Sequence, residues 1–84
     1  MSQYDRGYVY QRILESAENG ASESMIRSDA HLTYIEVDKY LYKMIENDLV
    51  RYDARACIYK TTRHGKDFLK TIKEVGYFLS FADK

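Results

Sequence analysis

The chain has 84 residues, enough for one small domain, and its 45% hydrophobic content is ordinary for a globular protein. It has a single cysteine and no run of about 18 apolar residues, which excludes an internal disulfide and a membrane-spanning helix. Its 13 basic and 13 acidic residues give a formal net charge of zero, which argues against a strong nucleic-acid binder.

Two helices are predicted in the first third of the chain. Apolar residues within 4–19 recur at the spacing of one helix face, and Gly20 follows where glycine commonly ends a helix. Residues 22–30 are predicted to form a short second helix, from which Met25 and Ile26 are expected to point inward. A very short link then leads to a longer segment, which is the spacing of a helix-turn-helix.

The strongest amphipathic pattern lies in residues 33–50, which are predicted to form a third helix, a tight turn and the start of a strand. Thr33 and Glu36 have the spacing of a capping box at the start of this helix. Asn47 and Asp48 both tolerate the left-handed conformation that commonly closes a helix. The residues expected to face the core are Val37, Leu41, Met44 and Ile45.

A β-hairpin and a last helix are predicted to follow. Residues 49–52 alternate weakly and resemble a strand, and residues 57–61 form the return strand after a turn at 53–56. Thr62 is expected to cap a final helix over 62–84, whose apolar end is too large for so small a core to cover. We therefore expect this helix to form a homodimer interface through Phe68, Ile72, Val75, Phe78, Leu79 and Phe81.

Charge is distributed unevenly along the chain. Residues 1–50 hold 5 basic and 9 acidic residues, a balance of −4. Residues 51–73 hold 7 basic and 2 acidic residues, a balance of +5. Such a basic segment can bind a polyanion even though the whole protein is neutral, although a solvated surface is the simpler interpretation.

Three helices, a two-stranded hairpin and a last helix are the elements of a winged helix-turn-helix, a mainly α fold with a small β-hairpin, here a single domain over 1–84. The run AHLT at 30–33 resembles the start of the third helix in archaeal winged-helix regulators. Tyr40-Leu41, followed by Leu49-Val50, resembles their tyrosine-leucine helix and glycine-leucine turn, with Asp48 where that family usually has glycine. Residues 59–69, YKTTRHGKDFL, resemble their motif from the wing to the last helix.

The resemblance covers nearly the whole chain and implies a small protein that binds double-stranded DNA. It implies either a transcription regulator or a nucleoid-associated protein of the cytoplasm, and some relatives dimerise through the last helix as an antiparallel coiled coil. The alternative is a winged-helix module for protein–protein contact that binds no nucleic acid. Zero net charge and the acidic residues of the third helix favour that alternative.

The third helix of a winged helix enters the major groove, while the wing contacts the backbone or the minor groove. The candidate residues on and before the third helix are Thr33, Tyr34, Ile35, Lys39, Tyr42 and Lys43. The candidate phosphate contacts are Arg27 on the second helix and Arg51, Arg55, Lys60 and Arg63 around the hairpin. Ile35 could pack on the second helix instead of contacting a base. Lys39 and Lys43 could be solvated without contacting DNA.

The sequence offers no support for catalysis, and we expect no enzyme activity, metal or cofactor. His31 and His64 lie in separate elements, and no metal-ligand spacing, nucleophile elbow or phosphate-cradling glycine loop is present. Cys57 is expected to be a small buried hydrophobe. The nine tyrosines are expected in the core or at an interface, with stacking on single-stranded bases as the alternative.

Overall fold

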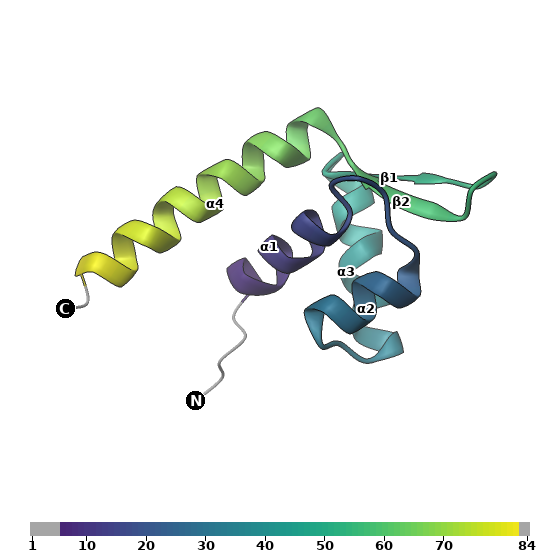
Figure 1. Cartoon of the computed structure of the whole chain (residues 1–84), viewed down its shortest axis with the longest axis horizontal. Helices are drawn as coiled ribbons and strands as arrows, with labels where there is room; N and C mark the ends of the chain where they lie inside the picture. Colours follow the sequence, from purple (N-terminus) through teal and green to yellow (C-terminus); the bar gives the residue numbers. More distant parts are fainter. Residues whose placement is uncertain (1–5, 83–84) are drawn as a thin grey trace.

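The computed structural model describes the backbone of residues 6–82 and the side chains of residues 7–75. Its order of elements confirms the predicted mainly helical fold with one antiparallel hairpin (Figure 1). The elements are α1 (Arg6–Ser16), α2 (Glu23–Ala30), α3 (Tyr34–Glu46), β1 (Val50–Asp53), β2 (Ile58–Thr61) and α4 (Arg63–Ala82). None of the described helices is long and apolar enough to cross a bilayer.

The first helix ends three residues earlier than predicted, because its last turn tightens before the chain reverses, while the predicted start at residues 4–5 lies outside the described residues. The amide of Glu18 donates to the carbonyl of Glu15, and the amide of Gly20 donates to the carbonyl of Ala17. Gly20 then adopts φ +94°, a left-handed conformation that glycine reaches without a steric penalty. The helix therefore ends at Ser16, and glycine terminates the turn as predicted.

The predicted capping box of α3 is confirmed. The hydroxyl of Thr33 accepts the Glu36 amide at 3.2 Å, and the Glu36 carboxylate accepts the Thr33 amide at 2.9 Å. His31 makes the preceding corner with φ 57°, and its left-handed backbone satisfies the last carbonyls of α2. This corner fixes the entry of α3, so the helix-turn-helix geometry follows from local hydrogen bonds.

One hydrophobic core joins all four helices and the hairpin. The fully buried side chains include Ile13, Leu14, Ile26, Val37, Met44 and Val50, with Leu41, Leu49 and Leu69 beside them. Val37, Leu41 and Met44 were predicted to face this core, whereas Ile45 is 42% exposed and that prediction is wrong. Ile45 lies about 80° round the helix from Val37, at the edge of the buried face. The prediction that Met25 points inward is also wrong, because this side chain is 55% exposed. The buried residues of α2 are Ile26 and Ala30.

The hairpin pairs Val50 with Thr61, and each following pair alternates between its two faces. Its return strand begins one residue later than predicted, because Cys57 closes the turn with φ 56°. That side chain is exposed, so the prediction of a buried cysteine is wrong. The Asp53 carboxylate holds the turn by accepting the amides of Arg55 and Ala56 at 3.0 and 3.3 Å.

A close junction ties the end of α3 to the start of α4. The Thr62 hydroxyl donates to the carbonyl of Asp48 at 2.6 Å and accepts the amide of Gly65 at 2.9 Å. Asp48 itself adopts φ +60°, so this position does take the left-handed conformation that the sequence indicated. A Cβ on Gly65 would overlap the carbonyl oxygen of Leu49. Thr62, just before α4, and Gly65, in its first turn, therefore have a structural function.

Candidate nucleic-acid interface

The outer surface of α3 combines apolar and cationic side chains. Ile35 is 71% exposed and Tyr42 is 68% exposed. Lys39 lies between them along the helix and Lys43 follows Tyr42, and both lysines are exposed. The exposure of Ile35 excludes the alternative that it packs on α2. Within the described side chains, ion pairs form only at Glu15, so neither lysine is neutralised by a carboxylate. A helix surface of this kind can offer lysine donors and apolar contacts to base edges.

Lys39 and Lys43 also border a shallow pocket that Tyr10 and Tyr40 line. The rings of these two tyrosines meet edge to face, with their centroids 5.8 Å apart. This contact joins α1 to α3 and gives the stems of the lysines an aromatic surface to lie against. The structure thus brings the two predicted lysines together on one side of α3.

Arg27 and Tyr34 form a second pair at the start of α3. The guanidinium carbon of Arg27 lies 4.3 Å from the centroid of the Tyr34 ring, a cation–π contact. The Arg27 Nε is buried without a hydrogen-bond partner among the described residues. Thr33 beside them is exposed, and its hydroxyl takes part in the capping box. Arg27 is therefore held by stacking on Tyr34, and its charge also acts on the nearby Glu23, where it opposes the rise in the pKa of that carboxyl.

The cations of the hairpin are not gathered on the surface of α3. Figure 1 shows the hairpin projecting from the body of the molecule beyond the helices. Arg55 lies exposed in its turn, whereas Arg51 and Lys60 are paired across the strands on one face. Tyr52 and Tyr59 occupy the other face, with ring centroids 4.7 Å apart. Of the predicted wing residues, Arg55 alone is placed in the turn, and Arg63 begins α4.

A pair of carboxylates lies between α2, α3 and the tyrosine face of the hairpin. Partial burial is the main cause that raises the pKa of Glu23, followed by a side-chain hydrogen bond to Asp38 and the charge of Asp38. Burial also raises the pKa of Tyr59, with the charge of Glu23 as the next cause. Sequence reasoning missed this pair because its members are 15 positions apart, on helices whose relative placement no local pattern reveals. Its negative charge opposes phosphate binding beside α3.

We expect Asp38→Asn to lower the pKa of Glu23 while leaving it above its ordinary value, because burial remains. Because the pKa of Glu23 is raised, the folded protein binds the proton of this carboxyl more tightly than the unfolded chain does. The resulting stabilisation is present below the unfolded pKa and is lost as the pH rises through the folded pKa. A carboxyl ¹³C NMR titration of both proteins measures the shift. Identical Glu23 midpoints would show that Asp38 has no influence.

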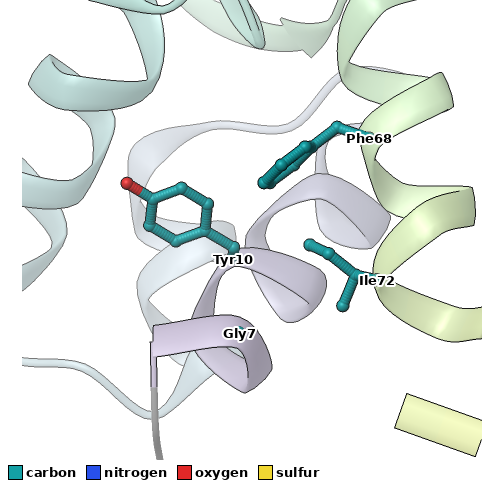
Figure 2. A pocket seen from close by; sticks show the side chains of 4 residues that line it. All are labelled: Gly7, Tyr10, Phe68 and Ile72. Carbon is teal, nitrogen blue, oxygen red and sulfur yellow. The ribbon is translucent and has the colours of Figure 1, made fainter. Parts of the chain in front are cut away.

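The predicted dimer surface is partly visible. Figure 2 shows Tyr10 of α1 and Phe68 and Ile72 of α4 around a shallow apolar pocket, with Gly7 beside them. Val75, further along α4, is 51% exposed. The side chains of Phe78, Leu79 and Phe81 lie outside the described residues. The described part of α4 therefore leaves apolar side chains accessible where the dimer interface was predicted to begin.

A search of the curated proteins found no match for this chain. A family model described as winged helix-turn-helix matches residues 5–79. The match extends from α1 through the hairpin into the last helix, in agreement with the order of elements in the structure. The chain therefore belongs to the winged helix-turn-helix family.

Proposed function

We propose that this protein binds double-stranded DNA, as a transcription regulator or nucleoid-associated protein of the cytoplasm. The observation that carries the proposal is the outer surface of α3, where Ile35 and Tyr42 are exposed beside two lysines that form no ion pair with any described carboxylate. In this mode α3 enters the major groove and Arg55 approaches the backbone from the hairpin turn. Arg27, stacked on Tyr34, adds a phosphate contact next to the start of α3.

A mobility-shift titration with a random-sequence duplex tests the proposal directly. We expect binding at low salt that weakens steeply as salt is raised, with a log–log slope of roughly −0.9 for each phosphate contact. Single-stranded DNA of the same length serves as the comparison, since stacking on exposed tyrosines would favour it over the duplex. A protein that binds neither duplex nor single strand at low salt contradicts the proposal.

We also propose that the protein acts as a homodimer through α4, which would set the spacing of two half-sites on DNA. The exposed apolar side chains of Phe68 and Val75 support this assembly. Val75→Asp is expected to shift the protein from dimer to monomer in light scattering, because a carboxylate cannot be desolvated there without a partner. Lys70→Asp places the same group on another side of α4 and should leave the dimer intact. A monomeric wild type at high concentration would refute the dimer.

The second candidate is a winged-helix module that recognises another protein and binds no nucleic acid. The observation in its favour is the Glu23–Asp38 pair, which places negative charge between α2, α3 and the hairpin. The duplex titration separates the two functions, because the module would not bind DNA at any salt concentration.

A further inference from the structure

A groove with a strongly positive lining lies on the outer face of the hairpin, where β2 leads into α4. Arg51, Lys60 and Arg63 supply its cations, and Asp53 and Thr62 are among its other lining residues. Asp53 is the only carboxylate in that lining, and its Oδ1 already accepts the amides of Arg55 and Ala56. Within the described side chains, none of the three cations forms an ion pair. The groove therefore presents uncompensated positive charge to whatever enters it.

The register of the hairpin places two of these positive charges where they destabilise the folded protein. Arg51 and Lys60 are direct cross-strand partners, and like charges placed opposite one another destabilise a hairpin. An anion bound between them would relieve that repulsion. Arg63 is the first residue of α4, a helix of 20 residues whose amino-terminal end adds a favourable field for an anion. Strand pairing and helix position thus both favour the same kind of ligand, an extended anion that contacts several cations at once.

The groove is turned away from the surface of α3. Side chains alternate between the faces of a strand, so Arg51 and Lys60 lie opposite the face of Tyr52 and Tyr59. Tyr59 is on the side of the Glu23–Asp38 carboxylates, whose charges raise its pKa. The groove consequently lies on the opposite face of the hairpin from the side that the Glu23–Asp38 carboxylates approach.

We propose that this groove is a second phosphate-binding surface, which holds the backbone of a nucleic-acid duplex independently of α3. The inference rests on the proposed function, since a DNA-binding protein has the backbone as its available polyanion. Three cations at the base of a hairpin contact phosphates without reading bases. The groove would therefore contribute affinity that depends on salt and not on sequence.

The test is an NMR titration of the ¹⁵N-labelled full chain with a random-sequence duplex at low salt. We expect the arginine Nε signals of Arg51 and Arg63 and the amides of β2 to shift together with those of α3. The same titration of Lys39→Glu/Lys43→Glu should retain the groove shifts while those of α3 disappear.

Each other outcome has a distinct meaning. Shifts in α3 without any in the groove overturn this inference and leave the proposed function standing. Groove shifts that vanish in the α3 variant also overturn it, because the groove would then only contact the duplex bound by α3. No shift anywhere rejects the proposed function together with the inference.

A salt-dependence measurement gives an independent readout. Arg51→Gln/Lys60→Gln should reduce the magnitude of the log–log slope by roughly 2, the share of two phosphate contacts. Lys70→Gln/Lys73→Gln removes the same net charge from exposed positions on α4 and should leave the slope nearly unchanged. An equal loss in both variants shows an effect of net charge and overturns the groove. Arg63→Gln provides a second groove variant that leaves both strands untouched, should thermal melting show the double variant to be unfolded.

Discussion

Replacing Gly65 by alanine is expected to lower the free energy of unfolding by about 2–3 kcal/mol, the usual upper range for forcing a methyl group into a filled site. The added Cβ would overlap the backbone carbonyl oxygen of Leu49 and crowd the Thr61 side chain. A backbone carbonyl cannot rotate away as a side chain can. The helix would have to shift, and the hydrogen bonds of Thr62 to Asp48 and Gly65 would lengthen.

Urea denaturation followed by circular dichroism measures this loss, with Gly7→Ala as the matched control. Gly7 is exposed within α1, where alanine is the better helix former by about 0.5–1 kcal/mol, so the control should be neutral or stabilising. A Gly65→Ala protein as stable as the wild type would show that the junction between α3 and α4 can move apart at no cost.

Local signals predicted the fold well because local hydrogen bonds determine most of its corners. The Thr33–Glu36 capping box, the left-handed Gly20 and the Thr62 cap are each formed by residues within three or four positions of one another. The errors arose where a face of a helix had to be oriented against the rest of the molecule. Met25 and Ile45 fit an apolar stripe on their own helices, yet both lie at the edge of the buried face and remain exposed.

The candidate site was harder to predict, because it depends on which face of the hairpin each cation occupies. The basic segment suggested one positive surface shared by the wing and α3. The alternation of side chains instead separates Arg51 and Lys60 from the face of Tyr52 and Tyr59. The weak turn signal left the register open, and a shift of one residue would exchange these faces. The structure fixes the register and so divides the charge between two surfaces.

Charge reversal at Lys39 and Arg55 together is expected to weaken duplex binding by about a hundredfold at low salt. Two unit charges 4 Å apart interact by about 1 kcal/mol in water, and a reversal replaces an attraction by a repulsion of similar size. Two reversals therefore change the binding free energy by at most about 4 kcal/mol, or roughly a thousandfold, which salt screening reduces. Both side chains are exposed, so the fold should tolerate the change.

Competition titrations of Lys39→Glu/Arg55→Glu against the wild type measure this effect, and the slope with salt should fall by roughly 2. The matched control is Lys70→Glu/Lys73→Glu, which alters the net charge equally on α4 and, among the described side chains, removes the surface ion pair of Lys73 with Glu15 at 3.2 Å. If both variants lose the same affinity, binding responds to total charge and α3 has no special part in it. If only the first loses affinity, binding depends on the positions of Lys39 and Arg55 and not on total charge, despite the carboxylates of Glu23 and Asp38 nearby.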